Sequence, residues 1–113
     1  MSSNVVQMRD VASVRDRVSP EEWQARIDLA AAYRLADIYN WADNIYNHIS
    51  IRVPGEPDFF LIKAHELLYE EVKASNLVKV DCRDDDVDES QHVNKPGFTL
   101  HGGVMRARPD VNA

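Results

Sequence analysis

This sequence lacks several of the features that identify a class of protein quickly. Its 113 residues include one cysteine, Cys82, so no disulfide can form within the chain. No apolar run approaches the roughly 20 residues that span a bilayer, and residues 1–18 lack the apolar segment of a secretory signal. A single cysteine and no export signal favour a reducing compartment, so we expect a cytoplasmic protein.

Clustered positive charge is missing as well. The sequence has 13 Lys and Arg residues and 19 Asp and Glu residues, which gives a formal net charge of −6. The basic residues are scattered along the chain. Binding to nucleic acid or to an anionic membrane needs a clustered basic face, so we expect neither. The content of 44% hydrophobic and 28% charged residues is typical of a globular protein, and a chain of this length is expected to form one domain.

Glycine and closely spaced metal ligands are also scarce. The four glycines are Gly55, Gly97, Gly102 and Gly103, and none lies in a glycine-rich phosphate loop. The four histidines are His48, His65, His92 and His101, and successive ones are separated by 17, 27 and 9 positions. Paired ligands on one helix or strand lie much closer in sequence, so we expect separate surface or hydrogen-bonded histidines. The acidic run at 84–86 lacks the central glycine of a calcium loop and is interpreted as a solvated surface.

The strongest local pattern is a long helix. Ser19 is suited to the N-cap, Pro20 to the first helical position and Glu22 to the reciprocal contact of a capping box. Apolar residues then recur at helical spacing, which predicts one buried face on a helix that reaches about Tyr39. That face consists of Trp23, Ile27, Ala30, Ala31, Leu35 and Ile38. Residues 1–18 precede this helix and are interpreted as a terminal arm.

The rest of the chain carries the patterns of three strands and a second helix. Alternating polar and apolar residues predict a strand at 45–53, and a short apolar run after a Pro-Gly turn predicts its hairpin partner at 59–62. A third strand is expected at 77–81 and a helix at 96–108. The acidic segment between them, at 83–95, is interpreted as a solvated loop or an irregular hairpin.

Asn47 is a candidate binding residue within the first predicted strand. It follows a turn and is expected on the opposite face from His48 and Ser50. A side-chain amide can donate to a phosphate or carbonyl oxygen. An asparagine just after a turn can equally stabilise that turn through its own contacts with the backbone, and both interpretations stay open.

Four blocks of sequence, in order, resemble one protein family. They are LAAAYRLADIYNWADNIYNHISIRV at 29–53, PGEPDFFLI at 54–62, LLYEEVKASNLVKVD at 67–81 and GFTLHGGVMRARPDVNA at 97–113. Together they resemble the N-terminal part of the class II aldolase/adducin family, and the IYNHIS strand and GF-x-x-H helix are most like the adducin-like branch. The resemblance implies an α/β fold, a partial α/β/α sandwich with a mostly antiparallel central sheet that is incomplete at its C-terminal side, and a homo-oligomer.

The resemblance also implies a chemistry. Enzymes of the family use a divalent metal ion, commonly zinc, to stabilise an enediolate while they cleave or epimerise sugar phosphates. By this resemblance Asn47 and Ser50 match substrate-binding positions, and His65 lies in the loop that binds phosphate. The same loop has Glu66 where glycine is usual, and a carboxylate there would repel a phosphate. Gly97 stands where the sugar-phosphate enzymes have their catalytic acid.

The zinc ligands of the family include an HxH pair that follows the RPDVNA block, and this sequence ends at Ala113. We therefore expect residues 19–113 to form a shortened class II aldolase/adducin domain that retains no metal ligands or cofactor and is non-catalytic by itself. A sugar phosphate or a small carbonyl compound is the ligand that the family implies. Two alternatives stay open: a fragment of a zinc-dependent lyase or epimerase, and an adducin-like scaffold or oligomerisation module.

Overall fold

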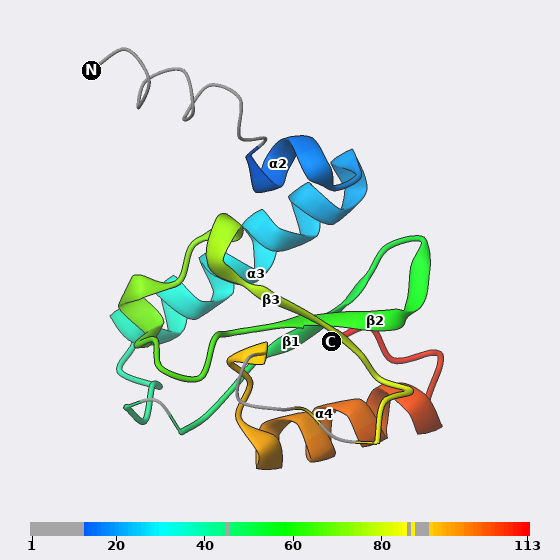
Figure 1. Ribbon diagram of the computed structural model, residues 1–113. Helices are drawn as coiled ribbons and strands as arrows, with labels where there is room; N and C mark the ends of the chain where they lie inside the picture. The colour runs from blue at the N-terminus through cyan, green and yellow to red at the C-terminus, as the bar shows by residue number, and fades with distance from the viewer. Residues whose placement is uncertain (1–12, 45, 86, 88–90) are drawn as a thin grey trace, which may run out of the picture.

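The computed structural model describes residues 13–44, 46–85, 87 and 91–113. Its elements are α2 Val14–Arg17, α3 Pro20–Ile38, β1 Ser50–Val53, β2 Glu56–Ile62, the 3₁₀ turns η1 Tyr69–Glu71 and η2 Ala74–Asn76, β3 Val78–Asp81 and α4 Lys95–Ala107. The strands form an antiparallel sheet in the order β1-β2-β3, with α3 on one face and α4 on the other (Figure 1). These layers confirm the predicted α/β architecture with its antiparallel sheet. In the part of the chain described here, no helix is long and apolar enough to cross a membrane.

The predicted arm falls mostly outside the described residues, since 1–12 are not among them. Its last part contains α2, whose N-cap is Ser13. The N-cap of α3 is Ser19, as predicted, and its hydroxyl accepts a hydrogen bond of 3.0 Å from the backbone N–H of Glu22. The carboxylate of Glu22 does not complete the predicted capping box, because it turns inward to Arg26 and Lys79.

The buried face of α3 was predicted wrongly. The apolar residues that α3 buries are Ala25, Leu29, Tyr33 and Ala36. On the predicted face, Ile27, Leu35 and Ile38 are 41%, 53% and 69% exposed. The helix is rotated about its axis by polar contacts instead, since Arg26 donates to the carbonyls of Ala74 and Leu77 from within the core. The face that is buried also carries Leu29 and Tyr33, which fill the cluster against the sheet, and these acceptors offset the cost of burying the Arg26 cation.

The first strand is shorter than predicted, because it begins at Ser50 rather than at residue 45. The hydroxyl of Tyr33 takes the place of a neighbouring strand: it accepts from the N–H groups of Ile49 and Lys63 and donates to the carbonyl of Ile49. The second strand is longer than predicted and pairs with β1 from Ser50 opposite Ile62. A bulge interrupts this pairing near Val53.

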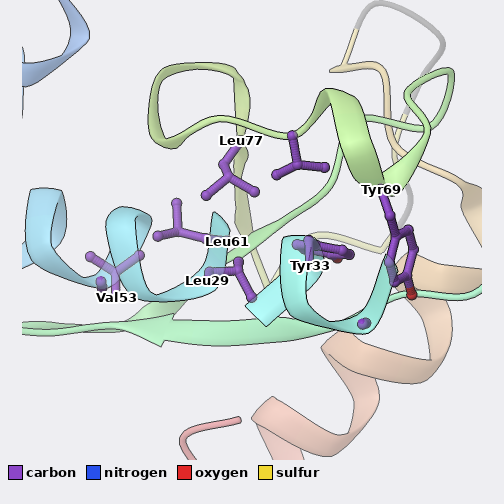
Figure 2. Close-up of a cluster of buried hydrophobic side chains, with 9 residues drawn as sticks. Leu29, Tyr33, Val53, Leu61, Tyr69 and Leu77 are labelled. Carbon is purple, nitrogen blue, oxygen red and sulfur yellow. The ribbon is translucent and has the colours of Figure 1, made fainter. Parts of the chain in front are cut away.

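Two hydrophobic clusters lie on the two faces of the sheet. The one between the sheet and α3 consists of Ala25, Leu29, Tyr33, Ala36, Val53, Leu61, Tyr69, Val72 and Leu77, most of which are labelled in Figure 2. The one beneath α4 consists of Phe60, Ile62, Val80, Cys82, Val87, Val93, Phe98 and Met105. Successive residues of β2 supply the two clusters in turn, as side chains of a strand alternate between faces. The sheet is therefore buried on both sides, and α4 is fixed where its N-terminal turn can contact the segment before β1.

Candidate functional site

Three histidines that are far apart in sequence come together beside the first turns of α4. The rings of His48 and His101 are 6.2 Å apart, centroid to centroid, and nearly perpendicular. His65 lies close enough for its charge to act on His48. The hydroxyl of Ser50 and Nδ1 of His101 are 2.6 Å apart and share a hydrogen bond. The wide spacing of the histidines in the sequence gave no sign that they would cluster. The one available signal was the NHIS block, which places His48 two residues before Ser50.

His48 is the most unusual of these side chains. Its Nε2 atom is buried and has no hydrogen-bond partner among the described residues. Burial lowers the pKa of His48 to about 4, and the positive charges of Lys63, His101 and His65 act in the same direction. Burial also lowers the pKa of His101. His48 is therefore a neutral imidazole at pH 7, with one buried ring nitrogen left without a hydrogen bond.

The imidazole of His48 packs directly against Gly97 in the first turn of α4. A Cβ atom at position 97 would lie 3.4 Å from both Cε1 and Nδ1 of His48, a tight contact. The backbone N–H of Gly97 donates to the Asn94 side chain over 2.9 Å, so the turn is held in place by its N-cap. A side chain at position 97 would therefore begin in contact with the imidazole. The ring thus occupies the space at the position where the resemblance implies a catalytic acid.

A cavity of about 380 Å³ opens beside this contact. Its polar lining includes His48, Ser50 and His101, and its apolar lining includes Leu100, Val104 and Met105. An apolar cavity with a few convergent polar groups is the usual form of a small-molecule site. Ser50, predicted to bind substrate, therefore lies in a cavity, although its hydroxyl is already hydrogen-bonded to His101.

The loop after β2 is built around a buried cation. Lys63 is fully buried, and its ammonium donates to the carbonyls of Ala64, His65 and Leu67 over 3.1, 3.3 and 2.7 Å. The N–H groups of His65 and Leu67 donate to the backbone carbonyls of His92 and Ala64. Glu66 does not adopt a positive φ. A loop that binds phosphate turns its N–H groups toward the ligand, whereas this loop turns three carbonyls toward Lys63.

The other two predicted substrate-binding residues, Asn47 and His65, do not line the cavity beside α4. The side chain of Asn47 accepts from the N–H of Asp43 and donates to the carbonyl of Trp41, both over 2.9 Å. These contacts are those of the turn-stabilising alternative. Nδ1 of His65 is 3.3 Å from the amide nitrogen of Asn94. A role for Asn47 or His65 in substrate binding stays a prediction.

The described side chains do not fit the divalent metal ion that the resemblance implies. No group of three or more His, Cys, Asp or Glu side chains in the described part of the chain is arranged to hold a metal ion. Within the histidine cluster, Nδ1 of His101 and Nδ1 of His65 are engaged by Ser50 and Asn94.

Acid is expected to destabilise the fold through His48. The imidazole titrates near its ordinary value of 6.5 when unfolded and near 4 when folded, so the unfolded chain binds the proton first. Stability should therefore fall as the pH drops from about 6.5 to about 4, by about 1–2 kcal/mol for a half-buried ring. Urea denaturation of the protein and of His48→Gln at several pH values measures this difference. A His48→Gln profile that parallels the parent profile over this range would contradict it.

Comparison with known proteins places this architecture among the α/β domains of class II aldolases. The family model described as "Class II Aldolase and Adducin N-terminal domain" matches residues 27–113. The chain is 45% identical over 101 residues to a "Putative aldolase class 2 protein" of Caulobacter vibrioides, covering 88% of this chain and 39% of that protein. It is 53% identical over 89 residues to alpha-adducin of Mus musculus, covering 76% and 12%. The chain belongs to the class II aldolase and adducin family.

Solved structures agree with this assignment. An aldolase II superfamily protein from Pseudomonas syringae superposes with a TM-score of 0.80 at 50% identity, covering 89% of this chain and 41% of that one. An L-fuculose 1-phosphate aldolase from Glaciozyma antarctica superposes with a TM-score of 0.71 at 24% identity, covering 90% and 41%. The second likeness shows the shared fold alone. The chain spans about two fifths of the putative aldolase and about an eighth of alpha-adducin.

Proposed function

We propose that this chain is a non-catalytic class II aldolase/adducin domain in the cytoplasm that serves assembly rather than carbon–carbon bond cleavage. The observation that carries this proposal is the contact between His48 and Gly97. Cleavage in this family depends on an acid at the position of Gly97, by the resemblance set out above. Here that position has no side chain, and a neutral imidazole packs on it.

The loop after β2 supports the same proposal. Its three carbonyls surround the ammonium of Lys63, and Glu66 adds a negative charge beside it. A phosphate dianion would meet oxygen atoms and a carboxylate instead of backbone N–H groups, which is electrostatically unfavourable.

A second candidate function is the binding of a small carbonyl compound or a sugar phosphate without turnover. The cavity beside α4 and the unpartnered Nε2 of His48 favour it. Saturable quenching or shifting of the His48 NMR signals by dihydroxyacetone phosphate, at concentrations where inorganic phosphate has no effect, would support it.

The assembly proposal predicts that the purified chain does not cleave phosphorylated ketoses, with or without added zinc. Retro-aldol cleavage is followed by coupled detection of the released aldehyde, with a family enzyme as the positive control. Turnover by the chain, reduced when His101 is replaced by alanine, would contradict the proposal and favour the lyase alternative.

A further inference from the structure

The ammonium group of Lys63 lies in a pocket made of backbone carbonyl oxygens. It donates to the carbonyls of Ala64, His65 and Leu67 over 3.1, 3.3 and 2.7 Å, so each of its three N–H groups has one acceptor. A neutral amine has only two N–H groups, and its lone pair would face the third carbonyl. The arrangement of the three carbonyls therefore requires a positive charge at the centre of the pocket.

The surroundings of the pocket also favour a cation. Lys63 is fully buried. Burial lowers the pKa of Lys63, while the negative charges of Glu66 and Glu71 act in the opposite direction. The carbonyl dipoles and these two carboxylates together make the electrostatic potential in the pocket negative. An uncharged group in the same place would leave the carbonyls without donors.

A set of backbone carbonyls aimed at one point is an arrangement that proteins use to bind monovalent cations. In potassium channels such carbonyls replace the hydration shell of the ion. An ammonium group and a potassium ion are similar in size and carry the same charge. Lys63 thus supplies, at the end of its own side chain, the kind of group that such a site would otherwise take from solution.

We propose that the loop at 63–67 is a binding site for a small monovalent cation, of the size of ammonium or potassium, which this chain fills permanently with the ammonium of Lys63. The inference goes beyond the proposed assembly function and does not depend on it. If the side chain of Lys63 is removed, the three carbonyls are expected to take up a cation from solution.

The filled pocket also supports the histidine cluster. The N–H of His65 donates to the carbonyl of His92 over 2.7 Å, and Nδ1 of His65 is 3.3 Å from the amide nitrogen of Asn94. Asn94 is the N-cap of α4 and accepts from the N–H of Gly97, on which His48 packs. The end of β2 and the start of α4 lie at the same end of the sheet (Figure 1). Emptying the pocket is therefore expected to disturb His48 as well as the loop.

Replacing Lys63 with alanine and then adding cations tests the inference. Lys63→Ala keeps the carbonyls and opens space for an ion. Urea denaturation is compared in potassium, ammonium, methylammonium and tetramethylammonium chloride at equal concentration, because tetramethylammonium is bulky and has no N–H group. A cation that binds with a dissociation constant of about 20 mM raises the folding equilibrium constant about tenfold when present at about 200 mM. We expect such an increase for the first three salts relative to the fourth, and no comparable difference for the parent chain.

Lys63→Met is the matched control, because its side chain is nearly as long as that of lysine and fills the pocket without a charge. Both variants are expected to be less stable than the parent chain, but only Lys63→Ala is expected to gain stability from the added cations. If Lys63→Ala is unfolded in tetramethylammonium chloride, recovery of the native circular dichroism signal in potassium chloride replaces the denaturation curve. Absence of that recovery would count against the inference.

Nuclear magnetic resonance locates the bound cation. In Lys63→Ala the carbonyl carbon signals of Ala64, His65 and Leu67 are expected to shift saturably with potassium, and the ring signals of His48 to return toward their positions in the parent chain. Equal stabilisation of Lys63→Ala by all four salts, equal stabilisation of Lys63→Met by potassium, or unchanged carbonyl signals would overturn the inference.

Discussion

Replacing Arg52 with alanine is expected to cost the fold about 3–5 kcal/mol, the usual effect of dismantling a buried charge site. Arg52 lies in β1 and is 7% exposed. Its guanidinium donates to the carbonyls of Met105, Arg108 and Val111 over 2.8–3.1 Å and to that of Pro57. The first two of these carbonyls belong to the C-terminal end of α4, where no intrahelical donor remains. The positive charge also complements the negative end of the helix dipole.

Without Arg52, the buried carbonyl of Met105 would be left without a donor, at a cost of about 1–3 kcal/mol, and the contacts with the carbonyls of Arg108, Val111 and Pro57 would be lost as well. Arg52→Lys is expected to recover only part of the loss, because an ammonium cannot reproduce the planar fork of donors. Urea denaturation monitored by circular dichroism measures the free energy of unfolding. Arg108→Ala is the control, since the Arg108 side chain is exposed and pairs only with the exposed Asp110 among described contacts, and it should change little. Equal effects of Arg52→Ala and Arg108→Ala would contradict this account.

Replacing Glu22 with alanine is the second change with a large expected effect, also about 3–5 kcal/mol, because it leaves a buried cation unpaired. Glu22 is 1% exposed, and its two oxygens accept from Arg26 and Lys79, each over 2.8 Å. Lys79 also pairs with Glu56 over 2.7 Å. This network joins α3 to β3 and to the β1–β2 hairpin.

The stabilisation that this network gives the fold is expected to be lost in acid. Burial acts to raise the pKa of Glu22, but the hydrogen bonds from Lys79 and Arg26 outweigh burial and leave it below 4.5. The stabilisation is therefore complete above about 4.5 and is lost as the pH falls through the folded pKa. Glu21→Ala is the control, since Glu21 is an exposed neighbour, and its effect is expected to stay within about 0.5 kcal/mol. A Glu22→Ala variant as stable as Glu21→Ala would refute the role assigned to the network.

Local signals predicted the helices well, because they depend on neighbours in sequence. Ser19 and Pro20 start α3 as predicted, and α4 runs from Lys95 to Ala107 against a prediction of 96–108. The rotation of α3 could not be predicted in this way. It depends on Arg26 reaching carbonyls about fifty residues further along the chain, and the apolar pattern alone pointed to the opposite face.

The contacts of the candidate site could likewise not be predicted from local sequence. The resemblance singled out Gly97, but nothing in the local sequence showed that His48 would pack on it. Nothing in the local sequence indicated that Lys63 would be buried at the centre of the loop after β2. The first half of the predicted strand at 45–53 is absent from β1, because the Tyr33 hydroxyl occupies the backbone groups of Ile49. Each difference arises from a contact between segments distant in sequence.

We propose that the residues of this chain do not by themselves build the metal-dependent site of its family. Isothermal titration calorimetry of zinc into the metal-free purified chain tests it most directly. The account predicts no tight stoichiometric binding and no difference between the parent chain and His48→Gln. One zinc bound tightly per chain, and weakened by replacing His48 or His101, would contradict it.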